Sequence, residues 1–406
     1  MPSVSYCYGG FYTQPYAYVP FIYNRKPMIL VLDILNVCGL IDLSEKTFAS
    51  ITGHEDNGKY ARIVDFNLSG SKVKSRIFYG HIGNDSWRLA DIEVDLSALT
   101  ASRTLIAEKT SSDDADITYL VKKGQVLSQR TILVAEGDKP YIWSVDAKDL
   151  SIISKYDTGF GEYNPRLSHQ IVIKPDDIYM LIGEHLDSAN FYKYAVYSET
   201  LTSISGSNPQ SSPNPMICNM FVSHKTRLLT GGANTIAGHN NLLCWFDDDF
   251  NLLAKTDLSS IYSTPYPEGL VIVGKKSNGN LVLVGLIANA HLIEVTANSL
   301  VYLEIDSSNY SLASYQKLQE FTDMNNAPYV LGTCLGTDSD RLGLPVIDVR
   351  SKKVYMTAWW KVGGDNRLGL VEFDLSDVDI VEWNQHAWFL NKTTIPTFLS
   401  LNVIPQ

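Results

Sequence analysis

The chain has 406 residues, of which 45% are apolar and only 19% are charged. This composition excludes an intrinsically disordered protein and suits a chain with much buried sheet. The length allows two or three ordinary domains or one large all-β domain. The net charge of −11 would repel a phosphate backbone, so we expect no nucleic-acid partner.

The first predicted elements lie in an apolar run at 28–43, MILVLDILNVCGLIDL, which contains Asp33 and Asp42. Two charges in a run of this length favour two strands over a membrane span, so we expect a soluble protein without membrane insertion. The residues before this run have neither a basic start nor an uninterrupted apolar core, so no secretory signal is expected. The five scattered cysteines form no C-x-x-C pair and are predicted to be buried apolar residues.

Pairs of β-rich runs follow one another along the whole chain. They are ARIVDFNL and KVKSRIFYG (61–80), the longer DITYLVKKGQVLSQRTILVAEG (116–137), HQIVIK and IYMLIGE (169–184), MFVS and RLLTGG (220–232), GLVIVGKK and NLVLVGLI (269–287), and LPVIDVR and KVYMTAWW (344–360). The first unit must take its first strand from SVSYCYG (3–9) or YAYVPFIY (16–23). Short turns within the pairs predict antiparallel hairpins.

The clearest unit runs from 269 to 318. Asn278-Gly279 between its first two runs predicts a type I′ hairpin, and 288–299 is predicted to be a longer loop before the third strand, SLVYLEID. A four-stranded meander cannot bury both of its faces alone, so further sheets must pack against it.

A hydrophobic residue followed by Asp ends each predicted third strand. These residues are Asp42, Asp95, Asp146, Asp247, Asp306 and Asp374, with Ser198 in the equivalent place in the fourth unit. The successive intervals are 53, 51, 52, 49, 59 and 68 residues, which indicates an internal repeat. We expect each Asp to accept hydrogen bonds from the backbone of the following turn rather than to act in catalysis.

Seven four-stranded units bounded by Gly, Asn, Asp and Ser resemble a seven-bladed β-propeller. The segments 178–204 and 227–253 resemble kelch-type blades, although the Trp that ends a kelch repeat is absent and only Gly231-Gly232 forms the full glycine pair. The resemblance implies a single all-β domain over 1–406, in which a terminal strand such as FLSLNVI (398–404) closes the ring. The expected units are 1–56, 57–112, 113–163, 164–207, 208–262, 263–320 and 321–406.

Long connections are predicted on one face of such a ring. They are 159–168, 205–218, 231–241, 288–299, 320–342 and 361–367, and we call the face that carries them the long-loop face. Binding sites are commonly built on loops held by a rigid scaffold. The long-loop face is therefore the predicted interaction surface. Its candidate binding residues are Trp87, Arg166, His185, His239, His291, Trp359 and Trp360.

Enzyme chemistry is the alternative interpretation. His81, His185, His239 and His291 are all predicted to lie in second-to-third strand loops, with Glu136 and Glu184 at the ends of second strands as matching carboxylates for a metal-dependent hydrolase or lyase. The sequence contains no H-E-x-x-H, no G-x-S-x-G and no phosphate-binding loop, so no cofactor and no catalytic residue are predicted. The favoured hypothesis is a non-enzymatic binding or structural module that contacts a protein or glycan within a larger assembly. Its Ser-, Thr-, Asn- and Tyr-rich composition is similar to that of virion-surface and cell-surface propellers.

Overall fold

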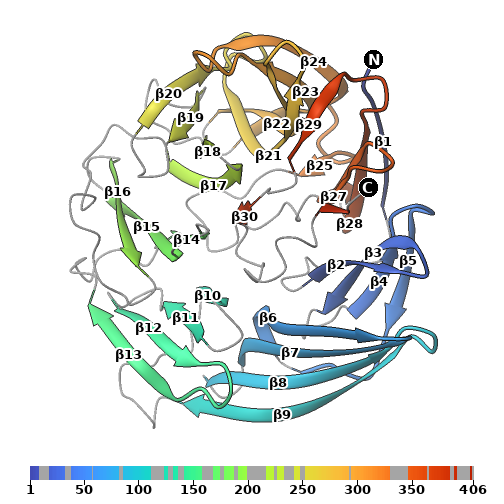
Figure 1. The fold of residues 1–406 in the computed structure, drawn as a ribbon, viewed down its shortest axis with the longest axis vertical. Helices are drawn as coiled ribbons and strands as arrows, with labels where there is room; N and C mark the ends of the chain where they lie inside the picture. The colour runs from blue at the N-terminus through green and yellow to red at the C-terminus, as the bar shows by residue number, and fades with distance from the viewer. Residues whose placement is uncertain are drawn as a thin grey trace.

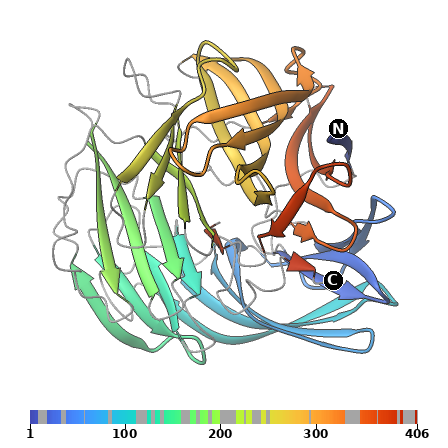
Figure 2. The same ribbon diagram turned by 45° about the horizontal axis from the view of Figure 1, so that its top comes forward.

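The computed structural model shows an all-β protein whose sheets stand around a common centre, the arrangement of a β-propeller (Figures 1 and 2). The structure describes residues 1–8, 18–32, 38–56, 58–81, 86–110, 123–126, 131–135, 141–157, 168–173, 178–186, 191–198, 216–223, 226–232, 242–246, 252–291, 294–329, 346–363, 365–384, 388–390 and 403–404. These residues contain no helix that could cross a membrane.

The N-terminal half contributes four antiparallel sheets in chain order. The first contains β2 (Tyr18–Tyr23), β3 (Lys26–Leu32), β4 (Cys38–Asp42) and β5 (Thr47–Ile51). The second contains β6 (Gly58–Ser69), β7 (Lys72–His81), β8 (Ser86–Asp95) and β9 (Thr100–Thr110). The third contains β10 (Lys123–Val126), β11 (Thr131–Ala135), β12 (Tyr141–Asp146) and β13 (Ile152–Asp157). The fourth contains β14 (Ser168–Ile173), β15 (Ile178–Leu186) and β16 (Phe191–Ser198).

The C-terminal half contributes three more sheets, each with added strands. The fifth contains β17 (Met216–Ser223), β18 (Thr226–Gly232), β19 (Leu242–Phe246), β20 (Leu252–Asp257) and β30 (Trp388–Leu390). The sixth contains β21 (Pro265–Lys276), β22 (Leu281–His291), β23 (Glu294–Ile305), β24 (Leu312–Phe321) and β29 (Ile380–Trp383). The last contains β25 (Pro328–Tyr329), β26 (Val346–Asp348), β27 (Lys353–Val362), β28 (Asp365–Asp374), β1 (Ser3–Tyr8) and β31 (Val403–Ile404).

The two ends of the chain meet in this last sheet. β1 pairs antiparallel with β28, from Ser3 opposite Asp374 to Tyr8 opposite Gly369. β31 pairs parallel with β26 on the other side of the same sheet. Of the two sequences expected to begin the first unit, 18–23 therefore supplies its first strand, and 3–8 joins the C-terminal sheet.

The C-terminal segment also adds strands to two neighbouring sheets. β29 pairs with β21, and β30 pairs with β17. β21 and β17 are the first strands of their sheets, and Figure 1 draws β30 near the centre of the ring. The side-chain amide of Asn384 donates to the Ile272 carbonyl at 2.9 Å, which fixes the end of β29.

Neighbouring sheets share hydrophobic clusters because some strands bury both of their faces. In β3, Ile29 and Val31 pack in one hydrophobic cluster with the last sheet, whereas Leu30 and Leu32 pack in a second cluster with the β6–β9 sheet. All four side chains are at most 1% exposed. Alternate side chains of one strand therefore contact different neighbouring sheets, which explains why its sequence is apolar without alternation.

The Asp-led turns have the predicted geometry. Asp95 accepts from the Ser97 amide at 2.9 Å, Asp306 from the Ser308 amide at 2.8 Å, and Asp374 from the Ser376 amide at 2.9 Å. Asp42 and Asp146 make the same contact with Ser44 and Lys148. The turn function of these five residues is thus confirmed, and Asp247 lies outside the described residues.

The turn between β21 and β22 differs from the expected type. The runs do pair antiparallel, for example Val271 with Val284. However, only Gly279 has positive φ (92°), and its amide donates to the Lys276 carbonyl at 3.0 Å. This is a type I turn followed by a glycine bulge, so the type I′ prediction was wrong. Asn278 instead accepts the Asn280 amide at 3.0 Å through its side chain.

Two predicted long loops are strands in the structure. β22 and β23 remain paired from Ala288 opposite Asn298 to His291 opposite Glu294, so most of 288–299 belongs to an extended hairpin. β27 and β28 pair as far as Val362 opposite Asp365, which makes 361–367 a tight hairpin. Gly363 has φ 60° in that turn, a conformation that glycine adopts without strain. The other four predicted loops lie wholly or largely outside the described residues.

Candidate functional site

Those of the predicted binding residues that the structure describes lie in four different sheets. Arg166 and His239 lie outside the described residues. His185 is in β15 opposite Tyr192, His291 is at the end of β22, and Trp359 is in β27 opposite Leu368. Of the carboxylates in the enzymatic alternative, Glu136 lies outside the described residues and Glu184 is in β15.

Trp87 and Trp360 pack inside the molecule. The Trp87 side chain is 0% exposed and its ring meets that of Trp143 edge to face, with centroids 6.0 Å apart. Trp360 is 1% exposed and stacks on Tyr6 of β1 at 4.8 Å. Trp360 also meets Phe321 of the sixth sheet edge to face, with centroids 5.5 Å apart. Packing between sheets, the other use considered for these residues, is therefore what both indoles do in this structure.

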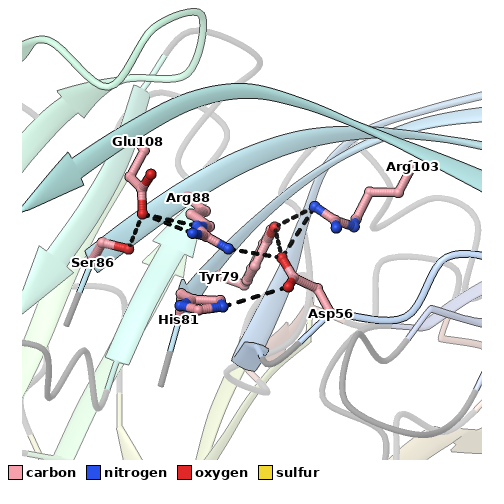
Figure 3. A network of polar contacts seen from close by, with 7 residues as sticks. All are labelled: Asp56, Tyr79, His81, Ser86, Arg88, Arg103 and Glu108. Atoms are coloured by element: carbon pink, nitrogen blue, oxygen red, sulfur yellow. Dashed lines mark hydrogen bonds and ion pairs between the residues drawn. The ribbon is translucent and has the colours of Figure 1, made fainter. Parts of the chain in front are cut away.

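The most developed polar cluster among the described residues surrounds Asp56 at one end of the β6–β9 sheet (Figure 3). We call it the Asp56 network. It consists of Asp56, Tyr79, His81, Ser86, Arg88, Arg103 and Glu108. Asp56 belongs to the connection from β5 to β6, and the other six residues come from β7, β8 and β9.

Strand register places the six residues of the sheet on the same face. Tyr79 is opposite Arg88, and Arg88 is opposite Glu108, while His81 is opposite Ser86. Directly paired residues in antiparallel strands point to the same side of a sheet. A register shift between Leu89 and Ala90 keeps Arg103 on this side as well.

Asp56 is the centre of the contacts. Its Oδ2 lies 3.1 Å from nitrogens of both Arg88 and Arg103, and it accepts the Tyr79 hydroxyl at 2.8 Å. His81 Nε2 lies 3.5 Å from its Oδ1. The Asp56 side chain is only 13% exposed, so these contacts replace most of its hydration.

A second carboxylate balances the second guanidinium. Glu108 Oε1 accepts from Arg88 Nη2 at 2.9 Å and from the Ser86 hydroxyl at 2.6 Å. Two carboxylates and two guanidinium groups are therefore paired in one partly buried cluster, with side-chain exposures between 12% and 28%. Such a network holds its members in fixed positions.

The network also affects Tyr79. Burial, with the hydrogen bond to Asp56, raises the pKa of the Tyr79 phenol above its ordinary value. The phenol therefore stays protonated and acts as a donor to Asp56 at physiological pH. This arrangement pairs the ionised groups with one another and holds them in fixed positions.

Metal binding has no support in this part of the molecule. Within the ranges that the structure describes, no three His, Cys, Asp or Glu side chains come together in a way that could hold a metal ion. Cys38 is buried as predicted, whereas Cys7 is only half-buried.

Sequence reasoning missed Asp56, Arg88, Arg103 and Glu108. Their signal was available in part, since Arg88 lies on the same face of β8 as the buried apolar residues Ala90, Ile92 and Val94. The pairing of Arg88 with Glu108 depends on the register shift in β9, which the sequence does not display. Asp56 is brought to the cluster by a connection that crosses the sheet, with the Ala101 amide donating to the Thr52 carbonyl at 2.8 Å.

Comparisons with known proteins assign the chain to no family. No protein-family model matches the chain, and no curated protein matches it. Oligogalacturonate lyase from Vibrio parahaemolyticus is similar at 12% identity over 91% of this chain and 97% of that chain, with a TM-score of 0.45. The β-propeller domain of Cps50 (Swd1) from Myceliophteria thermophila is similar at 11% identity over 92% of this chain and 99% of that chain, with a TM-score of 0.44.

A third similar structure is BBS1N, solved in complex with ARL6DN, at 7% identity over 90% of this chain and 94% of that chain, with a TM-score of 0.41. These proteins include both an enzyme and a chain solved with a protein partner. At such identities and TM-scores, none of them transfers an activity or a partner to this chain.

Proposed function

We propose that this protein is a non-enzymatic, closed seven-bladed propeller that binds a protein or glycan partner through its long-loop face. The observation that carries the proposal is the Asp56 network, a fixed and partly exposed polar cluster where the β5–β6 connection meets the end of β7. A binding surface whose groups are already held in place loses less affinity to ordering when the partner arrives.

The closed ring is supported by contacts between the first and last sheets. Lys46, in the turn between β4 and β5, donates to the Ser5 hydroxyl at 2.7 Å and lies 3.4 Å from Glu372 of β28. Ile29 and Val31 of β3 belong to the same hydrophobic cluster as Phe373 of β28. β1 then acts as the outer strand of the last blade, so separation of the first and last blades would expose both the apolar face of β3 and an unpaired edge of β28.

The chemistry of the Asp56 network fits recognition. Arginine is enriched at protein interfaces because its guanidinium binds carboxylates and stacks on planar groups. Arg88 and Arg103 are partly exposed and are kept in position by Asp56 and Glu108. A partner carboxylate or sugar hydroxyl would meet donors that need little rearrangement.

A site-resolved crosslinking experiment in the native host tests this proposal. The photoreactive amino acid benzoylphenylalanine would replace Glu55, Thr296 or Asp365, which are exposed residues at the long-loop end of three sheets. Ala98 and Lys148, exposed in turns at the opposite end of two sheets, are the matched controls. We expect crosslinked peptide or glycan at one or more of the first three positions and none at the controls.

Equal crosslinking at both ends of the sheets, or crosslinking at Ala98 and Lys148 alone, would refute the proposal. A native assembly in which the long-loop face contacts only solvent would refute it as well. Catalytic turnover by the purified chain would contradict the non-enzymatic part of the proposal.

A further inference from the structure

The edge of the sixth sheet is completed by a segment from a distant part of the chain. β29 follows the last sheet's β28 in sequence, yet it pairs with β21 of the sixth sheet. The described pairing has one register shift and consists of Gly274 with Trp383, Lys275 with Glu382, and Lys276 with Ile380. So short a ladder opens at a lower cost in free energy than the long ladders between the other strands of this sheet.

Only part of β29 is buried. Ile380 and Trp383 are partly buried and pack against the hydrophobic cluster that contains Val273. Val381 is 63% exposed, and Glu382 is exposed as well. Two of the four side chains therefore bury little surface, so β29 is held less firmly than the fully buried strands of the sheet.

Asn384 ends the pairing with two hydrogen bonds to the backbone of β21. Its backbone amide donates to the Val273 carbonyl at 2.8 Å, and its side-chain amide donates to the Ile272 carbonyl at 2.9 Å. An asparagine directly after the strand supplies both donors at once. These contacts involve main-chain acceptors of β21, so another strand that carries asparagine at this position would meet the same acceptors.

The edge of β21 is shaped to accept a strand. A Cβ atom on Gly274 would lie 2.8 Å from Ile380 Cγ2, so the absence of a side chain there lets the second strand approach. Without an occupant, the backbone groups of β21 on this side would form an unpaired strand edge, which attracts other strands. Detachment of β29 therefore favours its replacement by another strand over an empty edge.

Extended peptides bind sheet edges through main-chain hydrogen bonds, and the positions of their side chains give specificity. The segment at 380–384 shows which pattern this edge accepts. It has an aliphatic residue, two residues that face solvent, an aromatic residue and then an asparagine.

We propose that the β21 edge binds an extended peptide of a partner protein with this pattern, in exchange for the chain's own residues 380–384. The edge lies at the end of β21 next to the Ser277 turn, opposite the long-loop face. The proposal therefore does not depend on the proposed function of that face.

The test titrates the full chain into a fluorescein-labelled peptide with the sequence of residues 379–384 and measures fluorescence anisotropy. We expect saturable binding, because the edge is open to the peptide whenever β29 is detached. The control peptide has the same composition, with both neighbouring pairs within 380–383 reversed in order. It should bind at least about tenfold more weakly, since its apolar side chains no longer match the positions that face the cluster.

One substitution should have opposite effects in the peptide and in the chain. Trp383→Ala in the peptide should weaken its binding by about tenfold or more, because the indole no longer packs on the cluster. Trp383→Ala in the full chain should instead tighten binding of the unaltered peptide by at least about threefold, since β29 then competes less for the edge. Asn384→Ala in the chain removes only the side-chain hydrogen bond to Ile272 and should act in the same direction.

Gly274→Ala separates strand exchange from a general loosening of β29. This substitution also weakens the pairing of β29, but it should abolish peptide binding because the added Cβ blocks the edge for any strand. Val381→Ala in the chain, at the exposed position of β29, should leave peptide binding unchanged.

Four results would overturn the proposal. They are no saturable binding, equal binding of the two peptides, unchanged affinity in both Trp383→Ala and Asn384→Ala of the full chain, and undiminished binding in Gly274→Ala. A dimer of the parent chain in light scattering that Gly274→Ala converts to a monomer would overturn it as well, because the edge would then exchange strands with a second copy. Far-ultraviolet circular dichroism checks the fold of each variant, and Asn384→Ala keeps the test decisive if Trp383→Ala does not fold.

Discussion

Gly274 of β21 lies so close to the carbonyl oxygen of Glu382 in β29 that a Cβ atom on residue 274 could not fit between the two strands. The same atom would lie 2.8 Å from Ile380 Cγ2 and 3.1 Å from Trp383 Cα. The C-terminal segment can therefore pair with the sixth sheet because position 274 has no side chain.

Gly274→Ala should displace β29 and cost about 1–3 kcal/mol of unfolding free energy, as overpacking in a closely packed site usually does. Hydrogen exchange of the Asn384 amide measures the displacement directly, because this amide donates to the Val273 carbonyl at 2.8 Å. It should exchange faster in the variant. The Leu96 amide, bonded to the Ser71 carbonyl at 2.8 Å in another sheet, should be unaffected.

Asp56→Asn should destabilise the protein by about 2–4 kcal/mol. The substitution leaves Arg88 and Arg103 partly buried without a full counter-charge, and loss of one member of a buried ion pair is costly. Glu93→Gln in the same sheet is the control, because Glu93 and its partner Lys74 are 59% and 71% exposed and water screens their attraction, so this substitution should change stability far less than Asp56→Asn. Urea denaturation midpoints compare the two, and equal midpoints would contradict a structural role for Asp56.

Asp306 should contribute stability that depends on pH. Hydrogen bonds from Ser308 lower the pKa of Asp306 in the folded protein. A carboxyl with a depressed folded pKa stabilises the fold above its unfolded pKa, and this stabilisation is lost as the pH falls through the folded pKa. Asp306→Asn should therefore be less stable than the parent at pH 7, and the difference should shrink below about pH 4.

The measurement for Asp306 is the urea midpoint of parent and variant across this pH range. Asn278→Ala, which removes a neutral side-chain acceptor from the Asn280 amide, should give a difference that does not change with pH. A difference for Asp306→Asn that stays constant or grows on acidification would show that its charge does not stabilise the turn.

Lys352→Gly should stabilise the protein by up to about 1 kcal/mol, because Lys352 has φ 55° and is exposed. A left-handed residue also occurs four positions after Asp42, Asp95, Asp146 and Asp306, at Lys46, Leu99, Leu150 and Tyr310. Arg350, two residues earlier, does not have a positive φ. Arg350→Gly should therefore lower the stability, because glycine only adds conformational freedom to the unfolded chain. Thermal unfolding of both variants checks the opposite signs.

The sequence predicted the strands and the Asp-led turns because these depend on local patterns. Asp306 followed by serines, for example, specifies its own hydrogen bonds within the turn. The turn type predicted at Asn278-Gly279 was wrong. A type I′ turn and a type I turn followed by a glycine bulge both place this glycine at a positive φ, and only the register of β21 and β22 distinguishes them. The predicted loop at 288–299 was wrong because its polar residues are paired strands rather than a connection.

The candidate site was harder to predict because its residues come together through tertiary contacts. Arg88 lies opposite Glu108 only because the pairing of β8 with β9 shifts between Leu89 and Ala90. Asp56 reaches Arg88 and Arg103 from a connection outside the sheet. Trp87 and Trp360 were candidate binding residues on the basis of strand position, yet their ring neighbours Trp143 and Phe321 lie in other sheets. Nothing in the local sequence specifies such neighbours.

The pairing of β1 with β28 has a consequence during protein synthesis. The first strand leaves the ribosome long before its partner, and at about 5–20 residues per second it waits roughly 20–70 s for β28 to be made. During that time Tyr6 and Tyr8 have no Trp360 to pack against, and the edge of β1 has no partner. A nascent chain of this kind is exposed to edge-to-edge association with its neighbours on the same messenger RNA until its last blade emerges.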